Sequence, residues 1–410
     1  MNILFLTLVS IEDLSLRGIY TDLINELADR GINIYVVSPR EMRTGLSTEL
    51  SVIGRVHLLK VSTGNITKTN SSIKKGLVTL QIENQYLKAL KKYCPSIYFN
   101  MLMYSTPPIV FEKIVRYFKK KYSSKTFLIL KDIFPQNAVD IGIIKKNSFL
   151  WKFFRNKEKT LYKISDKIGC MSKGNVKYIL DHNPEIPKEK VEVFPNSINP
   201  IEAVQNKEKN LEIFSKYNIA SKLTVFIYGG NLGKPQGIDF LLEVISHFHL
   251  VRNSHLIIVG SGTEYGKIKK YINITAPINV SLYDVLPKAE YDQLLAIADV
   301  GLIFLDRRFT IPNFPSRLTS YMENSLPILA AVDKNTDLKD VLEESGSGFW
   351  VESGDINSFI KYANILSEDK DLRKKMGLKG RKYLEINYNI KKNVDSIVTY
   401  LKKNGAENYV

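Results

Sequence analysis

The stretch FIYGGNLGKPQG, Phe226 to Gly237, indicates the fold class of this chain. An apolar strand breaks into glycines and then leads into the helical sequence IDFLLEVISHF, the usual layout for backbone amides that hold a phosphate. Gly230 and Gly233 allow close approach of the backbone to a ligand, and Lys234 adds a positive charge at the mouth of the helix. The pattern favours a phosphate site, and an ordinary strand-to-helix turn is the alternative.

Strands and helices alternate on both sides of this stretch. The first half has strand-like runs at NILFLTLV, INIYVVSP, SIYFNML, TFLILKD and KIGCMS, with helices expected over residues 18–29, 77–93 and 150–163 and from Pro107. The second half restarts at LTVFIYGG and continues through HLIIVG, NVSLYD, VGLIFL, PILAAV and GFWVE. Such alternation predicts βαβ units and parallel sheets, so we expect two doubly wound α/β domains. Ligands bind beyond the carboxyl ends of such strands, which predicts a two-substrate enzyme.

Composition is that of a globular protein, with 44% apolar and 24% charged residues among 410. The first residues, MNILFLTLVSIEDL, lack a basic segment before the apolar run, and nowhere do 18 uncharged apolar residues follow one another. We therefore expect a first buried strand instead of a signal peptide, and a cytoplasmic protein. The two cysteines have no metal-type spacing, and the sequence implies neither a metal nor a cofactor.

Two further segments suggest ligand contacts in the second half. In FPSRLTSYMENSLPILA, Ser316 either caps a helix or binds phosphate, and Arg317 either pairs with that phosphate or faces solvent. In VGSGTEYG, Gly260 and Gly262 form a GxGxxxG pattern, and Asp284 near the end of the next strand is a candidate ribose partner. This spacing suits a nucleotide-binding turn better than a nicotinamide site.

With these segments in order, the chain resembles a retaining glycosyltransferase of family 4. The resemblance extends over RGIYTDLINELADRGINIYVVSP, KVEVFPNSI, YGGNLGKPQGIDFLLEVI, HLIIVGSG, YDQLLAIADVGLIFL, FPSRLTSYMENSLPILAAV and LRKKMGLKGRKYL. It implies the GT-B fold: an acceptor-binding Rossmann-like domain over residues 1–195, a facing nucleotide-sugar-binding domain over 196–386, and a C-terminal helix over 387–410 that returns to the first domain. LKDIFPQNAVDIG is most similar to the N-acetylfucosaminyltransferase-like enzymes of bacterial capsule, exopolysaccharide and O-antigen synthesis.

The resemblance also implies roles for single residues. Gly230, Asn231, Gly233 and Lys234 stand in the donor loop, and Ser316 with Arg317 stands where relatives bind the diphosphate. Ser320 and Glu323 are the candidates for the ribose, beside the nucleotide turn. Arg17 and Gly18 belong to the loop on the acceptor side. Lys131 and Asp132 are the candidate catalytic pair, with a plain charge pair at a strand end as the alternative.

Several positions depart from the family pattern. Many members have arginine where Asn231 stands and lysine where Gln236 stands, so the charge for the diphosphate must come from Lys234, Arg317 or both. Pro312 and Ser320 replace the paired glutamates, and Lys131 replaces a frequent histidine. Either ribose recognition is reworked here or activity is impaired.

The first half is strongly basic. Of the net charge of +16, residues 51–180 carry 25 Lys and Arg against 6 Asp and Glu. Lysines alternate with aromatics in YFKKKYSSK and NSFLWKFFRNKEKTLYK, a pattern that favours an anionic membrane surface over the packing of an ordinary amphipathic helix. We expect a protein held peripherally on the inner face of the cytoplasmic membrane. A nucleic-acid binder is the competing class, but no helix-turn-helix, RNP or zinc pattern is present, so no nucleic acid is expected.

The resulting expectation is an enzyme of the hexosyltransferase type. It would move a sugar from a nucleotide-sugar donor, most simply UDP-linked, to a saccharide on a polyprenyl diphosphate during surface-polysaccharide synthesis. A catalytically impaired sugar-nucleotide-binding protein of the same fold is one alternative, and a basic nucleic-acid-binding protein is another.

Overall fold

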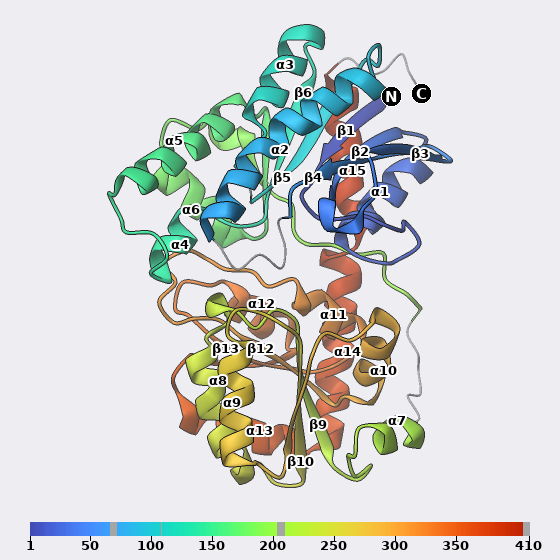
Figure 1. The fold of residues 1–410 in the computed structure, drawn as a ribbon. Coiled ribbons are helices and arrows are strands. Elements are labelled where there is room, and N and C mark those ends of the chain that lie inside the picture. The colour runs from blue at the N-terminus through green and yellow to red at the C-terminus, as the bar shows by residue number, and fades with distance from the viewer. Residues whose placement is uncertain (66–71, 108, 203–209, 405–410) are drawn as a thin grey trace. The chain divides into compact units, whose positions relative to one another are not determined.

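The computed structural model describes residues 1–65, 72–107, 109–202 and 210–404 of the chain. These residues form two compact units, each with its own sheet (Figure 1). Unit 1 comprises Met1–Asn199 and Asn389–Val410, and unit 2 comprises Pro200–Tyr388. The chain therefore leaves unit 1 once and returns to it once.

The sheet of unit 1 has eight strands in the order β3-β4-β2-β1-β5-β6-β7-β8. All neighbours are parallel except β3 and β4, which form an antiparallel pair. The strands are β1 (Asn2–Leu6), β2 (Asn33–Glu41), β3 (Glu49–Ile53), β4 (Val56–Thr63), β5 (Met101–Thr106), β6 (Lys125–Leu130), β7 (Lys167–Cys170) and β8 (Val191–Val193).

Helices surround this sheet, and the last of them comes from the end of the chain. α15 packs against α1, and Asn393 Nδ2 donates a hydrogen bond to the carbonyl of Pro195 (2.9 Å). The helices are α1 (Ile19–Asp29), η1 (Met42–Thr44), α2 (Ser72–Tyr93), α3 (Glu112–Tyr122), α4 (Gln136–Asp140), α5 (Phe149–Ile164), α6 (Lys173–His182), η2 (Lys188–Lys190) and α15 (Ile390–Lys403).

The sheet of unit 2 has six strands, all parallel, in the order β11-β10-β9-β12-β13-β14. The strands are β9 (Thr224–Gly229), β10 (Ser254–Val259), β11 (Val280–Tyr283), β12 (Val300–Phe304), β13 (Ile328–Val332) and β14 (Gly348–Glu352). The helices are α7 (Leu211–Lys216), η3 (Lys234–Gln236), α8 (Ile238–His247), η4 (Phe248–Leu250), α9 (Tyr265–Thr275), α10 (Lys288–Ile297), α11 (Arg317–Glu323), α12 (Leu338–Ser345), α13 (Ile356–Glu368) and α14 (Lys370–Asn387).

The apolar runs of the sequence became these strands because parallel strands are buried on both faces. Every residue of β9, β10, β12 and β13 is buried. The chain order β9, β10, β11 on one side and β12, β13, β14 on the other reverses at β9 and β12, which makes their carboxyl ends the topological switch point of this sheet. The expectation of two doubly wound parallel sheets is confirmed.

Three details of the first half were wrong or missed. SIYFNML was expected as a strand, but β5 begins only at Met101, because the preceding residues carry the turn that follows α2. The helix expected from Pro107 begins at Glu112. The β3–β4 hairpin was not predicted at all. Its outer strand β3 lies at the edge of the sheet, and its apolar residues Val52 and Ile53 are both exposed, so β3 lacks the alternation of apolar and polar residues that marks a strand.

Candidate functional site

The glycine loops after β9 and β10 pack directly on each other in unit 2. Gly230 N donates to Val259 O (2.9 Å), and Leu232 N donates to Ser261 O (2.8 Å). A Cβ added at Gly260 would lie 1.8 Å from Gly230 O, and one at Gly262 would lie 2.3 Å from Leu232 O. Gly260 and Gly262 therefore leave room for the loop after β9, so the packing of the two loops explains the spacing of this glycine pair.

Arg317, at the start of α11, reaches under the β9 loop. Its Cζ lies 4.4 Å from the centroid of the Tyr228 ring, and its Nη2 donates to Gln236 Oε1 (2.9 Å). A Cβ at Gly230, where φ is +131°, would lie 3.3 Å from Nη2. Glycine at this position therefore has two reasons: the backbone conformation and the approach of the guanidinium.

The same guanidinium has a buried group without a partner. Its Nη1 is buried and makes no hydrogen bond, and within the described residues no carboxylate forms an ion pair with Arg317. A buried cation with an unpaired donor is costly unless a ligand supplies the anion. An anion with several oxygen acceptors would satisfy it.

Tyrosines fix the surroundings of Arg317 without adding charge. Tyr321 Oη accepts a hydrogen bond from Gly229 N (3.3 Å) and lies 3.1 Å from Leu302 O, and the Tyr228 hydroxyl donates to Asn231 O (2.8 Å). Burial raises the pKa of Tyr291 to about 12 and also raises that of Tyr321. At neutral pH these hydroxyls are neutral, so they leave the charge of Arg317 uncompensated.

Of the other predicted diphosphate residues, Gly230, Asn231, Lys234 and Ser316 are exposed and Gly233 is buried. Lys234 begins η3, and among the residues described here its ammonium group has no partner. It lines a hollow of about 240 Å³ together with Glu264, Lys267 and Arg308. Ser316 is exposed and its side chain makes no capping hydrogen bond. The alternative that Ser316 caps the helix is therefore wrong, because its φ and ψ (−66°, −21°) are already helical.

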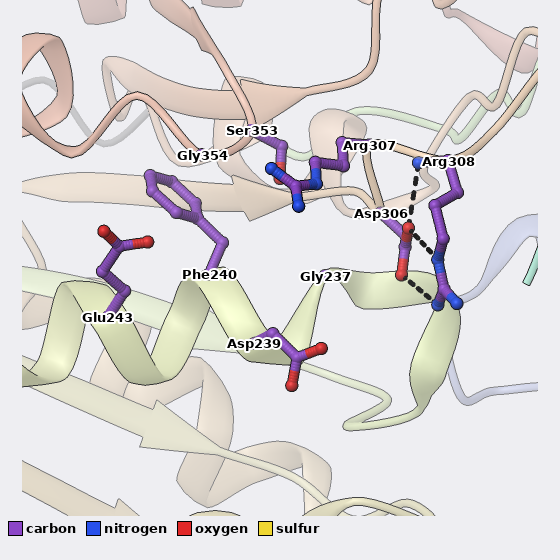
Figure 2. Close-up of a pocket in the computed structure, with 9 residues that line it drawn as sticks. All are labelled: Gly237, Asp239, Phe240, Glu243, Asp306, Arg307, Arg308, Ser353 and Gly354. Carbon is purple, nitrogen blue, oxygen red and sulfur yellow. Dashed lines mark hydrogen bonds and ion pairs between the residues drawn. The ribbon is translucent and has the colours of Figure 1, made fainter.

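A second hollow, of about 260 Å³, lies beside α8 (Figure 2). Phe240 and Glu243 of α8 form one wall, and the residues after β12 form another (Figure 2). There Arg308 Nη2 and Nε bind Asp306 Oδ2 and Oδ1 at 2.7 and 2.8 Å. Burial opposes ionisation of Asp306, but the hydrogen bonds from Arg308 outweigh it and lower the pKa of this carboxyl. Sequence reasoning missed this ion pair, although DRR directly after the buried strand VGLIFL was a usable signal.

The candidates for the nucleotide lie on separate elements. Asp284 follows β11 and is exposed, and its Oδ1 accepts from the amide of Val285 (2.6 Å). Glu323, at the end of α11, accepts through Oε1 from the amide of Ile201 (3.1 Å). Ser320 lies one turn earlier on α11 and is partly accessible. Asp284 thus lies after β11, whereas Ser320 and Glu323 share α11.

In unit 1, Lys131 and Asp132 follow β6 at the carboxyl edge of the sheet. Lys131 Nζ donates to Asn196 Oδ1 and lies 5.2 Å from the centroid of the Tyr20 ring. Burial lowers the pKa of Lys131 to about 7, although the charge of Asp132 opposes this, and burial raises the pKa of Asp132. Both side chains are only partly exposed, and within the described residues no ion pair joins them.

The predicted acceptor-side loop precedes α1. Gly18 is its N-terminal boundary residue in extended backbone, and Arg17 Nη2 donates to the carbonyl of Asn199. Asp22 Oδ2 accepts from the amide of the same Asn199 (2.8 Å). These bonds tie the start of α1 to the last residue of the first segment of unit 1.

The second half of the chain is similar to a known protein family. Residues 209–383 match the family model described as "Glycosyl transferases group 1". This part of unit 2 is therefore similar to that family. The β9 loop, the β10 loop and Arg317 all lie inside the matched range.

The chain is also similar to a curated protein. The chain is 26% identical over 236 residues to a protein of Pseudomonas aeruginosa named "Probable glycosyltransferase WbjE". The match covers 55% of each chain, so it spans about half the length of that relative.

Solved structures extend the likeness to both units. Sucrose-phosphate synthase from Thermosynechococcus elongatus has a TM-score of 0.74 at 13% identity and covers 99% of this chain and 100% of its own. HepE from Anabaena, in complex with UDP and glucose, has a TM-score of 0.67 at 14% identity, with 98% and 100% covered. Likeness at this identity shows the fold, and the fold is GT-B, as expected from the sequence.

Proposed function

We propose that this protein is a retaining glycosyltransferase of family 4, similar to the N-acetylfucosaminyltransferase-like enzymes, that takes its sugar from a UDP-linked donor bound by unit 2. The observation that carries the proposal is the guanidinium of Arg317, whose buried Nη1 has no partner among the described residues. A diphosphate supplies the oxygens and the negative charge that this group lacks. The similarity of residues 209–383 to the group 1 family and the UDP and glucose held by HepE support the same reading.

In this proposal Arg317 does the work that the family divides between an arginine at position 231 and a lysine at position 236. Gln236 accepts from Nη2 and Tyr228 stacks on the guanidinium, so Nη1 remains for the donor. The backbone of Gly230, Asn231 and Gly233 would approach the phosphates closely. Lys234 would add a second charge from the rim.

The chemistry follows from charge development. When the bond between the sugar and the diphosphate breaks, negative charge grows on the leaving diphosphate, and prepositioned cations stabilise it. The leaving diphosphate would help to deprotonate the acceptor hydroxyl on the same face of the sugar, so no protein nucleophile is needed. The loss of one such donor group typically costs about 3 kcal/mol of transition-state stabilisation.

The remaining candidates take supporting roles in the proposal. Gly260, Gly262 and Asp284 would bound the nucleotide, and Ser320 is better placed than Glu323 for the ribose, because the Glu323 carboxylate already accepts from the Ile201 amide. In unit 1, Lys131 and Asp132 would bind or orient a reacting hydroxyl.

On the acceptor side we propose a saccharide on a polyprenyl diphosphate, used in bacterial surface-polysaccharide synthesis. Arg17 and Gly18 would belong to its loop, and the basic first half would hold the enzyme peripherally on the inner face of the cytoplasmic membrane. Within the described residues no helix is both long and apolar enough to span a membrane. The charge of residues 51–180, 25 basic against 6 acidic, supports an anionic partner.

A thermal-shift comparison of UDP, GDP and dTDP sugars tests the donor part. A ligand at 100 times its dissociation constant adds about 2.7 kcal/mol of stability. We expect a clear shift with UDP sugars that disappears in Arg317→Ala and persists in Arg252→Ala, a control arginine whose partner Glu368 lies on the unit's surface. Absence of any nucleotide shift, together with tight DNA binding, would favour the nucleic-acid-binding alternative instead.

A catalytically impaired protein remains the second candidate, because Pro312 and Ser320 replace the paired glutamates. It is separated from an enzyme by turnover. Release of UDP in the presence of a lipid-linked acceptor supports the enzyme, whereas a UDP-sugar shift without release of UDP from any acceptor tried supports the impaired protein.

A further inference from the structure

One surface of unit 1 exposes large apolar side chains that the proposed chemistry does not use. It comprises residues 143–153, from the loop after α4 to the first turns of α5. Four of its side chains are exposed: Ile143 at 63%, Phe149 at 87%, Leu150 at 49% and, least of the four, Phe153 at 38%. Figure 1 shows α5 along the outer side of unit 1, on the opposite side from α1 and α15.

The exposure of this surface is not explained by a missing inner face of α5. The helix already packs a second stripe inward: Glu158, Leu161 and Tyr162 are buried, and Phe154 contacts Phe134 with ring centroids 5.0 Å apart. Phe149 and Phe153 are four residues apart and therefore share a different face. α5 thus presents apolar residues on two faces, and its own unit covers one of them.

Lysines are interleaved with the exposed apolar residues. Lys145, Lys146 and Lys152 are all exposed, and none has an ion-pair or hydrogen-bond partner within the described part of the chain. The surface of residues 143–153 therefore combines four apolar side chains with three uncompensated positive charges.

We infer that residues 143–153 dock on an anionic lipid bilayer. Phe149, Leu150, Phe153 and Ile143 would enter the boundary between headgroups and acyl chains, and the lysine side chains would reach the lipid phosphates. The biological role of this docking rests on the proposed function, since binding to the bilayer would bring the enzyme to a lipid-linked acceptor. It names a surface much smaller than the basic half as a whole.

Charge complementarity favours the bilayer over other occupants. A twofold contact between two copies would place the three lysines of one copy against those of the other. A nucleic acid would neutralise the lysines but would leave the aliphatic Ile143 and Leu150 without a partner, because single-strand binding relies on aromatic stacking. An anionic bilayer satisfies the charges and the apolar groups together.

Sedimentation of the full chain with lipid vesicles tests the inference. We expect binding to phosphatidylcholine vesicles that contain phosphatidylglycerol, and much weaker binding to phosphatidylcholine alone. Combined Phe149→Ala, Leu150→Ala and Phe153→Ala should weaken binding at least about tenfold, given the apolar area removed. Combined Ile274→Ala, Ile278→Ala and Leu378→Ala, at exposed positions of unit 2, should leave it unchanged.

The lysines are tested in the same way. Changing Lys145, Lys146 and Lys152 to Gln should weaken binding to the anionic vesicles by about fivefold for each charge at low salt. The matched variant with Gln at Lys370, Lys374 and Lys375, which are exposed in unit 2, should bind like the wild type.

Three results would overturn the inference: no vesicle binding, equal binding to both lipid compositions, or equal losses in the patch and control variants. A change in molecular mass of the patch variant in solution would instead assign the surface to self-association. The UDP-sugar thermal shift separates this inference from the proposed function. If the protein binds vesicles but no nucleotide, the docking surface is supported and the transferase proposal is rejected. If it binds the UDP sugar but no vesicles, the transferase proposal is supported and the docking surface is rejected.

Discussion

The two units each hold a partly buried cation at the carboxyl edge of a parallel sheet, but the two cations behave differently. Arg317 in unit 2 stays charged, because a guanidinium is not deprotonated in proteins and its tyrosine neighbours are neutral. Lys131 in unit 1 has a pKa lowered to about 7 by burial, so it carries a proton only part of the time at neutral pH.

The difference follows from what surrounds each group. Gln236 and the Tyr228 ring support the guanidinium without neutralising it, which suits a permanent binding site for phosphate. Lys131 has the neutral Asn196 and the Tyr20 ring as partners, which suits a group that exchanges a proton or binds a neutral hydroxyl. The carboxyl edges of the two sheets thus hold cations that differ in protonation: one is permanently charged and the other can lose its proton near neutral pH.

The largest effect is expected from removing the permanent charge. Arg317→Ala should remove about 3 kcal/mol of transition-state stabilisation, because the leaving diphosphate loses a prepositioned donor. This loss lowers kcat/KM by roughly two orders of magnitude. Arg317→Lys should recover little, since an ammonium cannot both donate to Gln236 in the same fork and stack on Tyr228. Steady-state kinetics with Arg252→Ala as the control measure this. Full activity of Arg317→Ala would show that Arg317 does not bind the donor diphosphate.

The titratable cation should make stability depend on pH. Between pH 7 and 10.5 the unfolded chain holds a proton on Lys131 that the folded chain has lost, so the free energy of unfolding should rise with pH in this window. The slope from this residue is at most about 1.4 kcal/mol per pH unit. Urea unfolding of the wild type and Lys131→Met across this range should show a more positive slope in the wild type, and the difference between the two slopes is the contribution of Lys131. Lys120→Met, at an exposed position, should keep it.

A counter-charge beside Arg317 should separate stability from binding. Gln236→Glu supplies the missing carboxylate, so the free energy of unfolding should rise while affinity for the UDP donor falls by about fivefold, near 1 kcal/mol. Gln236→Ala should lower both. Calorimetric titration and thermal melting measure the pair of effects. Stronger donor binding by Gln236→Glu would contradict a diphosphate at Arg317.

The smallest effect is expected at Ser316, beside Arg317. Because its side chain makes no capping bond, Ser316→Ala should change the free energy of unfolding by less than about 0.5 kcal/mol. Ser172→Ala should cost about 1 kcal/mol, since Ser172 Oγ accepts from the amide of Asn175 (3.2 Å) and caps α6. Chemical denaturation compares the two. A loss at Ser316 as large as that at Ser172 would show that it supports α11 after all.

Much of the fold could be predicted from the sequence, because buried parallel strands leave continuous apolar runs such as ILAAV and TVFIYG. The β3–β4 hairpin could not, since an edge strand half exposed to solvent has no such run. For the candidate site, the glycine loop and Arg317 were visible as residues. The contacts of Arg317 with Tyr228 and Gln236 could not be predicted, because the three residues come from different elements that only folding brings together.

By itself, therefore, the sequence determined the two parallel sheets, the position of the glycine loops and the excess of basic residues in the first half, because periodicity, turn chemistry and charge are local properties. Tertiary structure decided which cation is left without an anion, which lysine has its pKa lowered, and which apolar side chains of α5 stay uncovered. These depend on burial and on neighbours distant along the chain, and both arise only when the elements pack.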